Sequence, residues 1–294
     1  MILVNGRAHD LGGGFRVNRL LPSAGCRAVG PWIFIDHFGP VDVQPGMNID
    51  VRPHPHIGLA TVTWLFEGAL MHRDSVGSAQ RIEPGAINWM TAGRGIVHSE
   101  RTPDDLRTRH WRAHGLQLWI GLPRALEETS PAFHHVPAGR LPDLAEQGAR
   151  TRVLVGSAFG HASPVPALSP TLFLVIELAA GGTFSLPPLA QQCCIYPVDA
   201  DLLVDGTPLP ARTLGVLDAD SGCRIDAGAR VTVAVLGGAA LDGERQLWWN
   251  FASSDAARIR RAADDWEQGR FPRIEGETES IPLPRRPEAW GSAG

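Results

Sequence analysis

Glycine-rich turns recur at short, even intervals in the first half of this chain. Gly68, Gly77, Gly85 and Gly93 follow one another every eight or nine residues. Short strands separated by turns at this spacing are typical of a β-sandwich or a β-barrel. The 33 glycines and 24 prolines among 294 residues also favour turns over long helices. We therefore predict an all-β fold.

Two pairs of potential metal ligands flank this stretch. His54 and His56 form the first pair, and His98 and Glu100 form the second, each pair separated by one residue. Residues two apart on a strand point to the same face, so each pair can direct both side chains to one point. Pro55 lacks a backbone N–H, which indicates an edge strand or a strand end. If both strands face inward, three imidazoles and one carboxylate converge, a donor set that suits Fe, Mn, Ni, Cu or Zn.

An isolated His-x-His pair is more often solvated or hydrogen-bonded than bound to a metal, so the second pair strengthens the hypothesis. The first pair also resembles the first cupin motif, which continues with a glutamate and then a glycine. Here Thr61 stands at the glutamate position and Gly68 at the glycine position. Because threonine is a poor ligand, Glu100 would have to supply the carboxylate from the second motif.

This exchange of the carboxylate is the arrangement of the pirin family, which the chain resembles over nearly its whole length. The matching segments are HPHIG (residues 54–58), WMTAGRGIVHSE (89–100) and HGLQLW (114–119). The resemblance implies two tandem cupin domains. It also implies that His54, His56, His98 and Glu100 bind a single iron ion, Fe(II).

The chain length and the motif positions predict four parts. We expect a metal-binding cupin domain at residues 1–125, a connecting segment at 126–169 and a second cupin domain at 170–240. A helical, proline-rich tail at 241–294 should pack back on the barrels, as in this family. Residues 170–240 contain no histidine, so this domain cannot build the same site. We interpret it as a degenerate structural repeat.

Several elements can be placed from local patterns. Residues 15–21 alternate as an edge strand does, residues 30–40 form a buried strand, and residues 116–122 form an apolar strand. Residues 101–112 are polar and predict a loop at the barrel rim. A helix should follow the N-cap sequence at residues 253–255 and end before Gly269. One face of this helix carries Ile259, Ala262, Ala263 and Trp266.

Three positions allow both a functional and a structural interpretation. Gln117 is the one polar residue in its apolar strand, so it must face water or find a buried partner, and it is our candidate substrate contact. His37 could face the metal, but a hydrogen-bonded histidine in the core is the more common case, and we leave it out of the ligand set. Cys193 and Cys194 are a redox pair or two small hydrophobic residues in a strand.

Composition excludes some classes of function. The net charge of −4 leaves no support for direct binding of nucleic acid. No apolar run approaches the ~18 residues of a membrane span. The N-terminal residues lack a secretory pattern, and the four cysteines show no paired spacing, so we expect a cytoplasmic protein. Two barrels already share an internal interface, which favours a monomer.

Members of the resembled family include quercetin 2,3-dioxygenases. The resemblance therefore implies an iron enzyme that cleaves a flavonol with O₂, in which Glu100 could take the proton of the 3-hydroxyl group. Other family members act as iron-dependent, redox-sensing partners of transcription factors or metabolic enzymes. In a third interpretation the metal only stabilises the fold.

An enzyme should have an open apolar cavity over the metal, and Phe34, Trp64 and Met90 are candidates for its wall or for the core.

Overall fold

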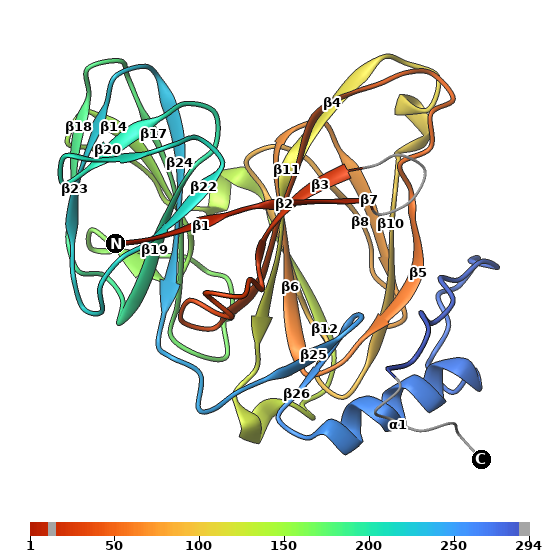
Figure 1. Ribbon diagram of the computed structural model, residues 1–294. Coiled ribbons are helices and arrows are strands. Elements are labelled where there is room, and N and C mark those ends of the chain that lie inside the picture. Colours follow the sequence, from red (N-terminus) through yellow and green to blue (C-terminus); the bar gives the residue numbers. More distant parts are fainter. Residues whose placement is uncertain (11–15, 288–294) are drawn as a thin grey trace.

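The computed structural model describes residues 1–10 and 16–287. Two β-sandwich domains stand side by side, and the helix α1 (Ala256–Glu267) lies beneath the N-terminal one (Figure 1). Each domain combines a seven-stranded sheet with a four-stranded sheet. The predicted all-β fold with a short C-terminal helix is confirmed.

The N-terminal domain contains the segments that carry the histidine pairs. Its larger sheet has, in spatial order, β12 (Ala132–Val136), β9 (Ile87–Thr91), β6 (Leu59–Glu67), β11 (Trp111–Gly121), β4 (Trp32–Val43), β3 (Arg16–Leu21) and β2 (Arg7–Asp10). Its smaller sheet has β5 (Val51–His56), β10 (Ile96–Arg101), β7 (Leu70–Asp74) and β8 (Ala79–Ile82).

The C-terminal domain repeats this plan. Its larger sheet has β1 (Ile2–Asn5), β22 (Thr213–Val216), β19 (Gln192–Pro197), β24 (Val231–Gly238), β17 (Thr171–Leu178), β14 (Ala149–Val155) and β13 (Asp143–Glu146). Its smaller sheet has β18 (Thr183–Leu186), β23 (Cys223–Ala227), β20 (Leu202–Val204) and β21 (Thr207–Leu209). The remaining elements are the hairpins β15 (Ser157–Ala158) with β16 (His161–Ala162) and β25 (Gln246–Trp248) with β26 (Phe251–Ser253), and the 3₁₀ turns Asp104–Leu106, Arg124–Leu126 and Ala138–Arg140.

The sheets do not follow the expected domain boundaries. The N-terminal strand β1 pairs with β22 of the C-terminal sheet. The expected connecting segment, 126–169, is divided, because β12 pairs with β9 of the N-terminal domain while β13 and β14 belong to the C-terminal sheet. Proline positions could not reveal this, since pairing between distant strands is decided by the tertiary fold.

The expected edge strand at residues 15–21 is wrong in its position. Phe15 lies outside the described residues, and β3 is covered on its outer side by β2. All four residues of β2 are exposed, which is why this short strand can occupy the edge. The strand expected at residues 116–122 begins earlier, at Trp111, because β11 pairs along both β4 and β6.

A hydrophobic core joins the two domains. Trp32 of β4 packs edge-to-face on Phe173 of β17, with ring centroids 5.9 Å apart, and its indole N–H donates to the carbonyl of Gly237 over 2.9 Å. Cys194 lies in this shared core, whereas Cys193 lies in the separate core of the C-terminal domain. The two thiols therefore occupy opposite faces of β19, and all four cysteines are free.

The tail covers one end of the N-terminal domain. Asp255 caps α1 by accepting a hydrogen bond from the backbone N–H of Ala257, and Ile259, Ala262 and Ala263 are buried. This face packs on Ile57 and Phe251. In the described part of the chain, no helix is long and apolar enough to cross a membrane.

Candidate metal centre

Three imidazoles meet between two neighbouring strands of the smaller N-terminal sheet. In the antiparallel pair of β5 and β10, His98 lies opposite His54, and Ile96 lies opposite His56. All three histidines are buried, and one nitrogen from each lies within 4.8 Å of the others. The three imidazoles thus converge because their strands are adjacent and the three side chains share a face.

Hydrogen bonds orient two of these rings. The Nδ1 atom of His54 lies 2.8 Å from the carbonyl oxygen of Arg52, and Nδ1 of His56 lies 3.0 Å from that of Asn250. A carbonyl oxygen can only accept, so both Nδ1 atoms carry the proton. Both Nε2 atoms therefore offer a lone pair toward the centre, as metal-binding histidines do.

The donor set fits a divalent ion. Burial lowers the pKa of His54 to about 4 and depresses the pKa of His56 and His98 well below the ordinary value. Neutral rings are the form that binds metals. The Nε2 atoms of His56 and His98 lie 3.1 Å apart. Two nitrogens bound about 2.1 Å from one ion, at a right angle, would be separated by about 3 Å.

Glu100 lines the same cavity without joining the cluster of three nitrogens. The ladder with β5 shifts by one residue between His98 and Glu100, but the extra residue lies on β5, and β10 pairs with β7 without a shift, so His98 and Glu100 face the same side. Burial raises the pKa of Glu100, and its Oε1 atom lies 3.0 Å from the Thr63 hydroxyl oxygen. The partly buried carboxyl group thus lines the same cavity as the imidazoles.

Thr63 was not singled out from the sequence. Its hydroxyl oxygen also lies 3.0 Å from Oε1 of Gln117, so one side chain of β6 links Glu100 to Gln117. Gln117 lines the cavity from β11. The available signal was the alternation of Thr61 and Thr63 along one strand, since both face the same side.

The cavity over the imidazoles measures about 530 Å³. Phe34 and Trp119 form one wall, stacked with ring centroids 3.9 Å apart and planes 11° apart. The guanidinium of Arg19 lies 4.4 Å from the Phe34 ring centre and forms a two-point ion pair with Asp36. Of the proposed wall residues, Phe34 lines this cavity, whereas Trp64 and Met90 belong to the hydrophobic core.

His37 points away from the cavity. Its Nδ1 lies 2.6 Å from the Tyr196 hydroxyl oxygen, and its Nε2 lies 2.7 Å from Nε2 of His114. Because Tyr196 belongs to the C-terminal domain, His37 is a hydrogen-bonded histidine of the domain interface. Its omission from the ligand set agrees with this position.

His72 and Asp74 are polar groups of the centre that sequence reasoning missed. Both are buried on β7, next to β10, and Nδ1 of His72 lies 3.4 Å from Nδ1 of His98. The other ring nitrogen of His72 lies 2.8 Å from Oδ2 of Asp74. The sequence does contain a signal for them: His72 and Asp74 form a third pair spaced two residues apart, and this pair lies between the two pairs that we identified.

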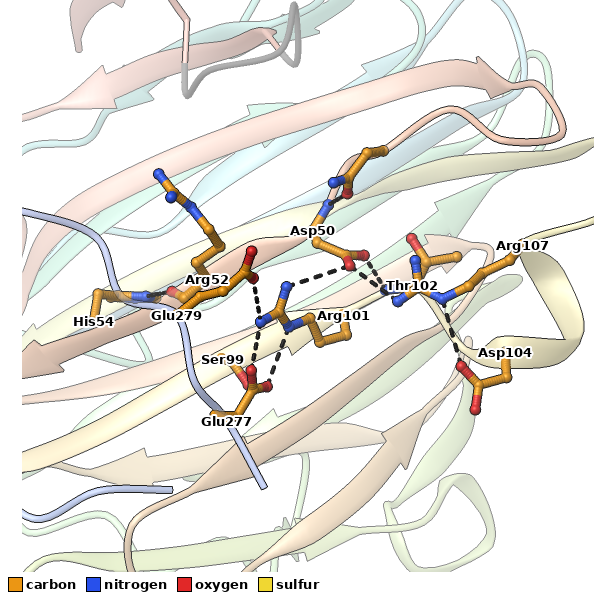
Figure 2. A network of polar contacts seen from close by, with 11 residues as sticks. Asp50, Arg52, His54, Ser99, Arg101, Thr102, Asp104, Arg107, Glu277 and Glu279 are labelled. Carbon is orange, nitrogen blue, oxygen red and sulfur yellow. Dashed lines mark hydrogen bonds and ion pairs between the residues drawn. The ribbon is translucent and has the colours of Figure 1, made fainter. Parts of the chain in front are cut away.

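The C-terminal segment completes the cavity wall. Figure 2 shows Glu277 and Glu279 reaching Arg101, whose guanidinium also contacts Asp50. Farther along, the backbone N–H of Ile281 donates to the carbonyl of Pro53 over 2.8 Å. Ile281 and Pro284 then line the cavity together with Phe34 and Trp119. Residues from the end of the chain thus contribute to the site built by β5 and β10.

Among residues 1–10 and 16–287, one cluster of three neutral imidazoles could hold a metal, and it lies in the N-terminal domain. Together with the two-domain cupin fold, this cluster defines a bicupin with a candidate metal centre. The chain belongs to the pirin family. The family model for pirin matches residues 14–120, and the model for the pirin C-terminal cupin domain matches residues 173–272.

The proteins similar to this chain include a pirin-like protein, a protein with a provisional enzyme name and a protein of known crystal structure. A pirin-like protein of Caulobacter vibrioides is 43% identical over 96% of this chain and 99% of its own length. A Pseudomonas aeruginosa protein with the provisional name quercetin 2,3-dioxygenase is 40% identical over 92% of this chain and 86% of its own. The crystal structure of a quercetin 2,3-dioxygenase from Acinetobacter baumannii matches with a TM-score of 0.90 at 33% identity, covering 98% of this chain and 96% of the other.

Proposed function

We propose that this protein is an iron-dependent dioxygenase that cleaves a flavonol with O₂. The main support is the cavity, which opens directly onto the three imidazoles and has a flat aromatic wall. The expectation for an enzyme was an open apolar cavity over the metal, and for a regulator a shielded centre. The names of the Pseudomonas and Acinetobacter relatives agree with this choice of reaction.

In this proposal His54, His56, His98 and Glu100 hold the metal. When bound, Fe(II) would supply Lewis acidity toward the oxygens of the substrate and a redox-active ion for O₂, while the flavonol itself supplies the electrons that the two inserted oxygen atoms take up. The three imidazoles supply neutral donors from a rigid pair of strands. Glu100 contributes the one negative charge among these four groups.

Glu100 is also the candidate general base. Burial raises the pKa of Glu100. A general base works best when its pKa lies near the working pH, so this shift favours the role. The hydroxyl of Thr63 fixes one carboxylate oxygen. To act as a base, Glu100 would leave the metal or swing on it, and its other oxygen would then take the 3-hydroxyl proton of a flavonol that lies beside the imidazoles.

Phe34 and Trp119 would hold the planar ring system by stacking and dispersion. Gln117 stands next to Thr63 on the cavity surface, where its amide can hydrogen-bond a carbonyl or hydroxyl group of the substrate. These contacts orient a flat, oxygenated aromatic molecule with its polar edge toward the imidazoles. They support a substrate class and leave the particular flavonol open.

The test is reconstitution with Fe(II) under anaerobic conditions, followed by addition of quercetin and O₂. We expect loss of the flavonol absorbance together with release of carbon monoxide. His98→Ala should abolish both bound iron and turnover, whereas the matched control His134→Ala, an exposed histidine of β12, should change neither. Turnover by a His98→Ala protein that holds no iron would refute the site.

A regulator is favoured by one observation. Glu100 lines the cavity, and the next residue, Arg101, holds the exposed C-terminal segment, so a change at the centre could reach the surface along β10. If one iron binds per chain and quercetin is not consumed, redox-dependent binding of a protein partner becomes the hypothesis to test.

A further inference from the structure

His98 differs from the other two histidines in the group that its Nδ1 atom meets. His54 and His56 each face a backbone carbonyl, which has a fixed role as acceptor. Nδ1 of His98 instead lies 3.4 Å from Nδ1 of His72, whose ring can donate or accept. The orientation of His98 therefore depends on which nitrogen of His72 carries the proton.

The surrounding contacts determine that assignment. Nε2 of His98 faces Nε2 of His56 at 3.1 Å, so this nitrogen is the one directed to the centre and Nδ1 keeps its proton. His72 must then accept at Nδ1 and carry its own proton on Nε2. That nitrogen lies 2.8 Å from Oδ2 of Asp74, which accepts it. Every donor in the chain from His98 to Asp74 meets an acceptor.

Asp74 is held firmly at the end of this chain. Its side chain has no exposed surface, and its second oxygen accepts hydrogen bonds from the backbone N–H groups of Val76 and Ser78 over 3.0 and 2.9 Å. The ring of His72 is fixed by stacking on Phe133, with centroids 4.2 Å apart. A buried carboxylate and a packed imidazole thus form a rigid support behind one ligand.

We propose that His72 and Asp74 are positioning residues of the metal centre. They hold His98 in the tautomer that binds through Nε2, and the charge of Asp74 makes His98 a stronger electron donor. This inference rests on the metal centre of the proposed function and deepens it. A more basic ligand increases metal affinity and favours the ferric over the ferrous state, which lowers the reduction potential of bound iron.

The first test measures Co²⁺ affinity in the full chain by competition with a chelator, with no substrate present. His72→Phe keeps an aromatic ring against Phe133 but removes the acceptor, and should weaken binding by about 10- to 100-fold. His72→Gln can accept from His98 and donate to Asp74, and should restore most of the affinity. The matched control His135→Phe removes a ring that bonds Asn88 instead, and should leave affinity unchanged.

The second test excludes a purely structural role. With iron bound, His72→Phe should raise the reduction potential, and His72→Gln should return it toward the wild-type value. Nitrogen NMR of the histidine rings in the zinc-loaded wild-type protein should show His72 protonated on Nε2 and bare on Nδ1. This measurement needs no variant, so it decides the question even if His72→Phe does not fold.

The outcomes separate this inference from the proposed function. Affinity of His72→Phe within threefold of wild type, or a proton on Nδ1 of His72, would overturn the positioning role while the metal centre stands. Failure of the wild-type chain to bind Co²⁺ would overturn the centre itself. Binding of iron without turnover of quercetin or any other flavonol would reject the flavonol dioxygenase and leave the positioning role intact.

Discussion

At the scale of single residues, the candidate centre depends on groups that are distant in sequence. The spacing of His54 with His56 and of His98 with Glu100 could be recognised because period-two alternation is a local property of strands. The carbonyl of Asn250, which orients His56 from 194 residues away, could not be recognised. Local patterns thus identified the candidate donors, while the groups that fix their tautomers required the folded chain.

Glu100→Gln tests the role of the carboxylate. The amide keeps the size of the side chain and can still contact Thr63, but it cannot take a proton. If Glu100 is the general base, quercetin turnover should fall by about 10²- to 10⁴-fold. Bound iron is measured in parallel, so that loss of chemistry is separated from loss of metal.

Thr63→Val is the matched control for this substitution. It removes the hydroxyl that fixes Glu100 while preserving shape, and turnover should fall by a smaller factor than in Glu100→Gln. Turnover of Glu100→Gln within threefold of wild type, with a full complement of iron, would contradict the general-base role.

At the scale of elements, β10 serves two sides of the barrel. His98 and Glu100 reach the cavity, while Ser99 and Arg101 reach Glu277 of the C-terminal segment (Figure 2). Alternation along the strand explains both roles. The family resemblance implied that the tail packs on the barrels, but a proline-rich segment has no periodicity that indicates which strand it contacts.

Arg101→Ala should loosen this segment. Arg101 and Glu277 are mostly buried, and hydrogen bonds between charged groups contribute about 1.5–3 kcal/mol each when well formed. We expect faster amide hydrogen exchange at residues 277–281, with the free energy of global unfolding lowered by about 2 kcal/mol or less. Since Ile281 and Pro284 line the cavity, the Michaelis constant for a flavonol should also rise.

Arg81→Ala is the matched control, because Arg81 forms ion pairs with Glu83 and Asp105 on the exposed surface of the same domain. Such pairs contribute about 0–1 kcal/mol. Exchange at residues 277–281 should not change in this variant. Equal exchange rates in Arg101→Ala and wild type would show that the segment is held by its apolar contacts alone.

At the scale of the whole molecule, the two barrels share one core. The all-β fold could be predicted because turn spacing and strand composition are local. The domain boundaries were harder to predict from the sequence, because β1, at the start of the chain, pairs with β22 of the C-terminal domain. Pairing of this kind depends on packing such as that of Trp32 on Phe173, which brings distant segments together.

The buried histidines of the domain interface predict how stability depends on pH. Burial lowers the pKa of His37 to about 3, and burial lowers that of His114 to about 4. In the unfolded chain both rings titrate near 6.5, so below this pH the unfolded state binds more protons and stability falls as pH falls. The loss begins near pH 6.5 and ends near the folded-state values. At pH 5.5, His37 alone should lower the free energy of unfolding by about 1.4 kcal/mol.

His114→Gln separates this interface from the other histidines. The amide can still hydrogen-bond Nε2 of His37, but one titrating group is lost, so the slope of unfolding free energy against pH between 5 and 6 should decrease by about 1.2 kcal/mol per pH unit. Urea unfolding of the metal-free protein at several pH values measures it. His110→Gln, at an exposed position, is the control and should keep the wild-type slope. An unchanged slope in His114→Gln would mean that the His114 ring of the wild-type protein is already protonated in the folded state. Its contact with His37 would then need a different arrangement of protons.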